Sequence, residues 1–391
     1  MIKIYNLLLT LIFFGLLMSC SSFDERVESN NDTRYTTITA ETPSYDFGTD
    51  TRTTFDLSTA RFLWSSGDKV GIISEAGSQL CFPIRDEDSG ETTASFNGRG
   101  WGLLSSSKYL AYYPFISDYD LDYSSVPVSY LDQIQVGNND YSRLGNYAFW
   151  VASGVSPQEG NLHFSFKDVG GVIRFTIPAF SGNYQQVTLS VSEPLFTSSG
   201  FVNLSSGDGL IVNPEKCDEL GLKLRECEII EDGTSLIGYL MTAPLDLTGK
   251  TLYVIAEQEG GKSSISSIAG REIIAGKAFN MVSKMTAYPY EQSVGSGAET
   301  IEVKLLTNNV SATMSSDETW ISLESSSVDG NNITTYTFNV AENTGVERIG
   351  TISFTEASTG LVNTVKVTQQ KAGTVIGIGG WDSEYRSGRA N

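Results

Sequence analysis

His163 is the only histidine in the 391-residue chain, and this limits the catalytic chemistry that the sequence can support. HExxH zinc sites and other multi-histidine ligand sets need at least two histidines. A Ser-His-Asp triad would depend on this one residue, and no G-x-S-x-G motif accompanies it. His163 alternates with Leu162, Phe164 and Phe166, so a strand would turn it toward solvent. We therefore predict a surface histidine with no catalytic role.

Carboxylates are the other groups that could do chemistry here. The 46 acidic residues offer many pairs, and a pair can hydrolyse a glycosidic bond if the fold brings it together. The acidic run at residues 86–88 is followed by Ser89 and Gly90, which favours an exposed turn; calcium binding through oxygen ligands is the alternative, without an EF-hand loop. The glycine run at residues 377–380 lacks the strand-to-helix setting of a dinucleotide loop. We predict no catalytic residue, no metal and no cofactor, and keep a hydrolase with a hidden carboxylate pair as an alternative.

Cysteine usage is sparse, which argues against a disulfide-rich scaffold. Cys217 and Cys227 could close a small loop in an oxidising envelope, which would stabilise the fold by roughly 2–3 kcal/mol. The alternative is that both are unpaired small apolar residues. The sequence leaves both options open.

Exposed aromatic side chains could bind sugar rings by stacking, with nearby polar groups holding the hydroxyls. Such candidates lie in polar loops and in the C-terminal tail, although ordinary partial burial would also explain them. Trp64 and Trp320 stand at strand starts, and we predict that both belong to cores. The four ligand-contacting candidates are Tyr119, Tyr123, Tyr141 and Trp381.

The N-terminus indicates where the protein is located. Lys3 precedes an apolar run at residues 4–17, and Cys20 follows, an order typical of secretory signals. The segment resembles a bacterial lipoprotein signal, which implies removal of residues 1–19 and lipidation of Cys20; an ordinary secretory signal is the alternative. Asp24 and Glu25 resemble signals that send lipoproteins to the outer cell surface. We expect an outer-membrane, surface-exposed, lipid-anchored protein with a polar tether at residues 20–50.

The charge of the chain argues against nucleic acid as a partner. The formal net charge is −20 at pH 7, and no cluster of Lys and Arg offsets it. A strongly acidic surface repels phosphate backbones and anionic lipid headgroups. The lipid on Cys20 would therefore be the attachment to the membrane.

The patterning after the tether favours strands throughout. Hydrophobic residues alternate with period two, and segments rich in β-branched and aromatic residues are bounded by turn residues. Many short strands with frequent turns predict antiparallel sandwiches, hence an all-β fold. We place a first sandwich at 51–158, a second at 159–290, a linker at 291–297, a third sandwich at 298–371 and a Gly-rich tail at 372–391.

Five motifs in order resemble the fimbrillin-like proteins of Gram-negative anaerobes. The resemblance implies two transthyretin-like β-sandwiches in series, in proteins that serve as pilus subunits, pilus anchors or tip adhesins. The motifs occupy residues 64–72 (WSSGDKVGI), 109–114 (YLAYYP), 162–175 (beginning LHFSFK), 241–244 (MTAP) and 275–279 (AGKAF).

The C-terminal region is similar to the BACON-type domain, an immunoglobulin-like sandwich. That resemblance implies a module suspected of binding glycans or mucin, although such modules often precede hydrolase domains and none is visible here. The matching segments are residues 320–323 (WISL), 338–345 (FNVAENTG), 347–354 (ERIGTISF) and 365–370 (VKVTQQ).

Together these resemblances predict a non-enzymatic surface lipoprotein, an adhesin or pilus accessory or tip subunit that presents a BACON-like module. Arg52 stands where proteolysis in polymerising fimbrillins releases a leading strand, and a strand of the next subunit then fills the groove. The expected partners are the outer membrane, host glycans or mucin, and pilus subunits. The alternative is a glycan- or mucin-binding lipoprotein of a polysaccharide-uptake system.

Overall fold

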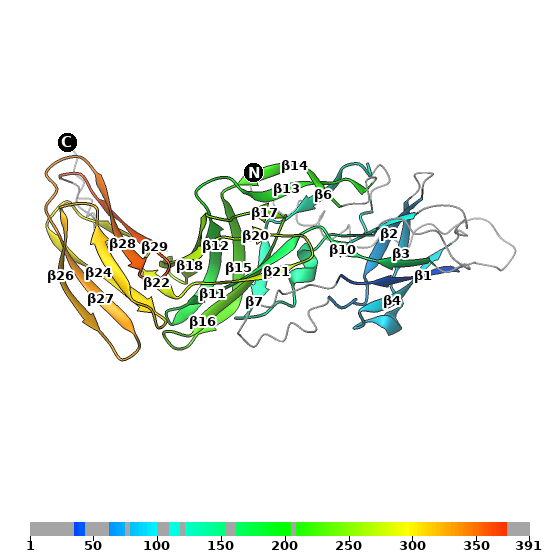
Figure 1. The fold of residues 1–391 in the computed structure, drawn as a ribbon, viewed down its shortest axis with the longest axis horizontal. Coiled ribbons are helices and arrows are strands. Elements are labelled where there is room, and N and C mark those ends of the chain that lie inside the picture. Colours follow the sequence, from blue (N-terminus) through cyan, green and yellow to red (C-terminus); the bar gives the residue numbers. More distant parts are fainter. Residues whose placement is uncertain are drawn as a thin grey trace, which may run out of the picture.

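The computed structural model describes residues 35–43, 62–74, 79–99, 109–117, 122–152, 162–204 and 209–373. Regular structure in these ranges is strand, apart from two short 3-10 helices, η2 (Asp86–Asp88) and η3 (Leu144–Tyr147). The predicted all-β sandwich class is confirmed. The strands follow one another along an elongated molecule, with the N-terminal strands at one end and the C-terminal strands at the other (Figure 1). Among the described helices, none is long and apolar enough to cross a membrane.

The first group of strands encloses a core of aromatic side chains. Its strands are β1 (Tyr35–Glu41), β2 (Lys69–Ser74), β3 (Gln79–Pro83), β4 (Thr93–Arg99), β5 (Tyr109–Tyr113), β8 (Trp150–Ala152), β9 (Leu162–Ser165) and β10 (Lys167–Asp168). One sheet has the order β4-β1-β9, and the other has the order β10-β8-β5-β2-β3. Trp64 lies in this core, edge-on to Phe96, Tyr113 and Trp150, as predicted for a core residue. Such edge-to-face packing stabilises aromatic clusters beyond the burial of their area.

The second group of strands forms the middle of the molecule. Its strands are β6 (Val126–Ser129), β7 (Gln133–Val136), β11 (Gly171–Pro178), β12 (Gly182–Ser190), β13 (Phe196–Val202), β14 (Ile211–Cys217), β15 (Glu219–Ile229), β16 (Ser235–Thr242), β17 (Leu245–Asp246), β18 (Thr251–Gln258), β19 (Ser263–Ala269), β20 (Glu272–Ile273) and β21 (Ala278–Val282). The sheet β16-β11-β21 shares a core with the run β19-β18-β12-β15. Phe175, Val187, Leu222 and Val254 are fully buried there.

The third group of strands contains the region predicted as the C-terminal sandwich, residues 298–371, and two strands that precede it. Its strands are β22 (Met285–Tyr288), β23 (Glu291–Val294), β24 (Glu299–Thr307), β25 (Ala312–Ser316), β26 (Ile321–Val328), β27 (Ile333–Val340), β28 (Arg348–Glu356) and β29 (Val362–Gln369). Ile301, Val303 and Leu305 point into one core, as their alternation predicts. A single register pair, Ile265 with Ala287, connects β19 to β22, so nine described strands form one sheet from β26 to β7.

The predicted polar tether contains a core strand, which is a correction to the sequence analysis. Residues 35–41 form β1, and Ile38 and Ala40 in it are fully buried. The alternation of Thr37, Ile38, Thr39 and Ala40 is short and embedded in polar sequence. Composition averaged over the whole segment therefore concealed it. Residues 20–34 and 44–50 of the predicted tether lie outside the described ranges.

Several strands pair across the positions where we placed domain boundaries. β6 and β7 lie within 51–158, yet they pair with β13 and β15. β22 lies within 159–290 but pairs with β24. The predicted linker begins with β23, which pairs in parallel with β29 and buries Val294. Strands at the ends of a sandwich thus complete the sheet of the next one.

Candidate assembly and ligand sites

β1 is the element that closes the first group of strands. It pairs antiparallel with β4 along its whole length and in parallel with β9 from Ile38 to Glu41. Its inward residues, Ile38 and Ala40, fill the core, whereas Thr37 is exposed. The β-branched residues of this segment suit a pleated, half-buried strand. Because β1 lies between β4 and β9, both of its backbone edges are paired from Ile38 to Glu41.

The contacts around β1 show what its removal would expose. The buried Trp64 indole donates a hydrogen bond from Nε1 to the carbonyl of Ala40 at 3.1 Å. The backbone N–H of Thr42 donates to the carbonyl of Thr92 at 2.9 Å. Without β1, strands β4 and β9 would each present an unpaired edge beside an apolar groove, which is a template for another strand. Arg52, the predicted processing residue, follows β1 in the chain and lies outside the described residues.

A groove of about 300 Å³ lies at one end of the C-terminal group. Trp320 and Ser322 line it at the start of β26, and Asn339 and Val340 line it from the neighbouring strand β27. The other lining residues are Ala298, Glu299, Thr300, Thr319 and Ala341. An aromatic ring beside hydroxyl, amide and carboxylate groups is the chemistry of sugar binding.

Arg348 holds Trp320 in place at this groove. Its guanidinium carbon lies 4.3 Å from the centre of the indole, a cation–π contact. Its Nη2 donates to the carbonyl of Ala341 at 2.7 Å, and its Nε donates to Gln369 at 2.8 Å. Trp320 is partly buried and packs against the core of the C-terminal group, so the predicted core position is confirmed in part. Sequence position alone could not reveal this, because a strand-start tryptophan can face either way.

Of the four predicted aromatic ligand residues, the structure describes Tyr123 and Tyr141. Tyr119 and Trp381 lie outside the described residues, as does the lipidation residue Cys20. Tyr123 is partly buried against the first core, and this burial raises the pKa of its phenol. Tyr141 is exposed, with its ring 5.8 Å from that of Tyr239. Neither of these two tyrosines lines the groove at Trp320.

The surface position predicted for His163 is confirmed. Its side chain is exposed on β9 between the buried Leu162 and Phe164, and its Nδ1 lies 2.8 Å from Oγ1 of Thr39. The acidic run at 86–88 forms η2, where the Asp88 carboxylate accepts a hydrogen bond from the backbone N–H of Ser95 at 2.7 Å. In the described ranges no group of three or more His, Cys, Asp or Glu side chains could hold a metal ion.

Of the two options left open for Cys217 and Cys227, the structure has the unpaired one, because both are free thiols. Cys217 ends β14, whereas Cys227 lies near the far end of β15 opposite Tyr184. At about 3.3 Å per residue, the part of β15 from Glu219 to Cys227 spans roughly 25 Å. A disulfide needs Cα atoms within about 7 Å. Sequence separation suggested a small loop, but the extended strand holds the two residues apart.

Comparisons with known proteins give structural similarities only. No protein-family model matches the chain, and no curated protein matches it. A candidate cell adhesion protein from Bacteroides ovatus is 12% identical with a TM-score of 0.44, and the match covers 64% of this chain and 93% of that one. Another from Bacteroides fragilis is 13% identical with a TM-score of 0.36, covering 63% and 91%. An endo-fucoidan hydrolase of glycoside hydrolase family 107 is 11% identical with a TM-score of 0.18, covering 78% and 39%.

Proposed function

We propose that this chain is a non-enzymatic cell-surface lipoprotein that acts as an adhesin or as an accessory or tip subunit of a pilus. The observation that carries the proposal is the position of β1, a central strand that precedes Arg52 in the chain. The five fimbrillin-like motifs also fall at or beside strands of the first two groups, β2, β5, β9, β11, β16 and β21. In this proposal, lipidated Cys20 anchors the chain in the outer membrane and the sandwiches extend outward.

Cleavage after Arg52 would separate β1 from the rest of the chain. The strand would then be held only by its pairing with β4 and β9 and by buried side chains such as Ile38. A strand of a partner with the same alternation could replace it by β-augmentation. The partner in the proposed role is another pilus subunit.

The test is to cleave the detergent-solubilised full chain with an arginine-specific protease and then add a labelled peptide of residues 34–43. We expect saturable peptide binding by the cleaved chain and none by the uncleaved chain. The Arg52→Ala variant treated with the same protease controls for cuts elsewhere. A peptide with Ile38→Asp should fail to bind, because it would bury a charge in the groove. If the cleaved chain keeps its own strand and binds no peptide, the assembly role is wrong.

The groove at Trp320 favours a second candidate function, glycan or mucin binding. The proposal rests on the aromatic ring and on the amide of Asn339, which line the same groove of about 300 Å³. We expect the full chain to bind members of a glycan and mucin array. Trp320→Ala should reduce binding at least tenfold, whereas Ile230→Ala, which changes an exposed side chain elsewhere, should not. Equal binding by both variants would exclude the groove as the glycan site.

A further inference from the structure

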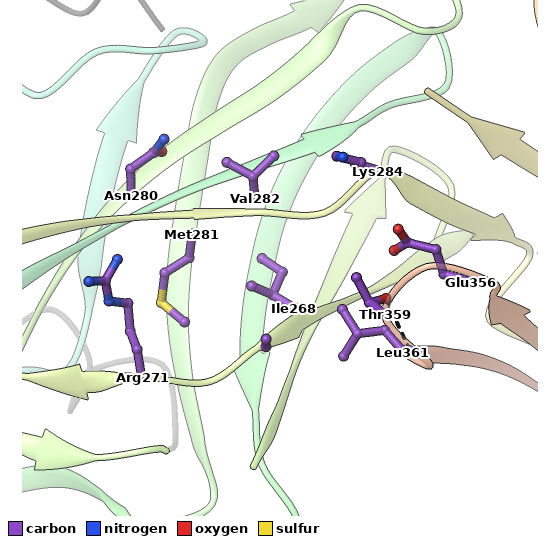
Figure 2. A pocket seen from close by; sticks show the side chains of 10 residues that line it. Ile268, Arg271, Asn280, Met281, Val282, Lys284, Glu356, Thr359 and Leu361 are labelled. Carbon is purple, nitrogen blue, oxygen red and sulfur yellow. Dashed lines mark hydrogen bonds between the residues drawn. The ribbon is translucent and has the colours of Figure 1, made fainter. Parts of the chain in front are cut away.

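A second cleft lies where the middle group of strands meets the C-terminal group (Figure 2). Its volume is about 200 Å³, enough for one sugar ring rather than an oligosaccharide. Residues of β19 and β21 form one wall, and the turn between β28 and β29 forms the other. The lining residues are Ile268, Ala269, Arg271, Asn280, Met281, Val282, Lys284, Glu356, Thr359 and Leu361.

The two walls of this junction cleft are fixed relative to one another. Asn363 on β29 is fully buried, and its Nδ2 donates to the carbonyl of Met285 at 3.0 Å. The same carbonyl accepts a hydrogen bond from Oγ of Ser283 at 2.9 Å. The pairing of Ile265 on β19 with Ala287 on β22 joins the middle group of strands to the C-terminal group near the cleft. A cleft held in this way is preorganised, so ordering its walls costs little when a ligand binds.

One end of the cleft is cationic. Arg271 stands there with its guanidinium carbon 5.0 Å from the centre of the Phe279 ring, a contact that orients the group. Asn280 lies on the same side in Figure 2, and its Oδ1 accepts a hydrogen bond from Nη1 of the buried Arg174 at 2.5 Å. Within the described residues the guanidinium of Arg271 forms no ion pair. A planar guanidinium next to an amide is well suited to bind a carboxylate.

The other end of the cleft carries hydrogen-bonding groups of mixed charge. The Glu356 side chain is 3% exposed, and its Oε1 accepts a hydrogen bond from Oγ of Ser358 at 2.5 Å. Thr359 and the exposed Lys284 lie on the same side in Figure 2, with Met281 and Ile268 between the two ends. A buried carboxylate accepts hydroxyl protons, and an ammonium donates to hydroxyl oxygens. Apolar side chains between them match the ring of a sugar.

We propose that this junction cleft binds a carboxylate-bearing sugar, such as a uronic acid residue of a glycan. The sugar carboxylate would bind Arg271, and its hydroxyl groups would bind Glu356, Thr359 and Lys284. The chain as a whole carries a net charge of −20, so a cleft lined by two cations and one carboxylate, Glu356, is a local exception. The inference goes beyond the proposed function, because it depends neither on release of β1 nor on the groove at Trp320.

The test compares two ligands that differ only at one carbon, methyl β-D-glucuronoside and methyl β-D-glucopyranoside. Binding to the detergent-solubilised full chain is measured by saturation-transfer NMR titration. We expect a dissociation constant of about 1 mM for the glucuronoside, typical of a ligand of this size. The neutral glucoside should bind at least tenfold more weakly, because it leaves Arg271 without its partner.

Four variants identify the site. Arg271→Gln should bring the two affinities to within about twofold, and Lys284→Gln should weaken both ligands. Lys262 is an exposed lysine in the β18–β19 turn, and Lys262→Gln is the matched control. Neither Lys262→Gln nor Trp320→Phe should change the affinity for either ligand. Thermal unfolding of each variant checks that the fold is retained. Three results would overturn the proposal. The first is equal binding of the two ligands, and the second is no binding of either ligand at 20-fold the expected dissociation constant (about 20 mM). The third is an equal loss of affinity in Lys262→Gln and Arg271→Gln.

Discussion

The indole Nε1 of Trp64 donates a hydrogen bond to the carbonyl of Ala40 at 3.1 Å, in the interior of the first group of strands. This contact joins β1 to the segment that precedes β2, two parts of the chain that pair with different sheets. Trp64 also packs edge-on against Phe96, which lies on the neighbouring strand β4. One side chain thus stabilises β1 through both a hydrogen bond and the core beneath it.

Trp64→Phe should destabilise the fold by about 2–4 kcal/mol. The change removes a buried hydrogen bond and leaves a cavity where part of the indole was. Urea denaturation followed by circular dichroism measures the loss. Tyr141→Phe, at an exposed ring, should stay within about 0.5 kcal/mol of the unchanged chain. A similar stability for both variants would mean that the Trp64 contact contributes nothing measurable.

Gly238→Ala should destabilise the second group of strands. Gly238 on β16 is directly opposite Phe175 on β11, and a Cβ at this glycine would overlap the phenyl ring. Moving a buried ring off its rotamer typically costs about 1–3 kcal/mol. Gly330→Ala is the matched control, because a Cβ there would meet no atom within 4 Å. Denaturation midpoints of the two variants should therefore differ, and equal midpoints would contradict the tight packing at Gly238.

The protein should lose stability between pH 10 and pH 12 in a manner that depends on Tyr112. Burial raises the pKa of this phenol to about 12, against an ordinary value of 10.0. In that window the folded state keeps a proton that the unfolded state releases, so stability falls as pH rises, by about 2–3 kcal/mol for this group.

Tyr112→Phe should make that fall shallower, because the substituted side chain does not titrate. It should also lower stability at pH 7 by about 1 kcal/mol, since the hydroxyl contacts the backbone of Ile116 at 3.3 Å and 3.5 Å. Urea unfolding at pH 7, 10, 11 and 12 gives both the stability at pH 7 and its dependence on pH. An unchanged slope would show that Tyr112 ionises with its ordinary pKa.

Reducing agent should leave the melting temperature unchanged, because Cys217 and Cys227 are free thiols. Desolvation raises the pKa of the buried Cys227 thiol to about 11, and since the thiolate is the reactive form, iodoacetamide should label it only after unfolding. Mass spectrometry before and after denaturation counts the labelled cysteines. A drop in melting temperature on reduction would instead indicate a disulfide, whose loss typically costs about 2–5 kcal/mol.

Local patterns were sufficient to predict β24, β27, β28 and β29 of the C-terminal group. Ile352 and Phe354 on β28 and Val365 and Val367 on β29 alternate strictly, and all four are buried. Alternation with period two needs only neighbouring residues, so it can be found without knowing the partners of a strand. The same reasoning failed for β1, whose short pattern is embedded in a polar segment.

The sites depended on contacts between residues far apart in sequence. Trp320 lines a groove together with Asn339, which the fold brings next to it on the neighbouring strand β27. The junction cleft joins Arg271 to Glu356, and no pattern in the sequence links these two residues. Patterns of residue type report which face of a strand is buried, but not which strands meet.

By itself the sequence determined the all-β class and the outward orientation of His163, because these follow from residue types at neighbouring positions. Only the tertiary structure decided that β1 is a central strand and that the nine-stranded sheet crosses the predicted boundaries. It also decided that Cys217 and Cys227 stay apart. The physical reason is that the backbone of any strand can supply the hydrogen bonds that another strand needs. Which strands pair is therefore decided by side-chain packing in the core and not by local sequence.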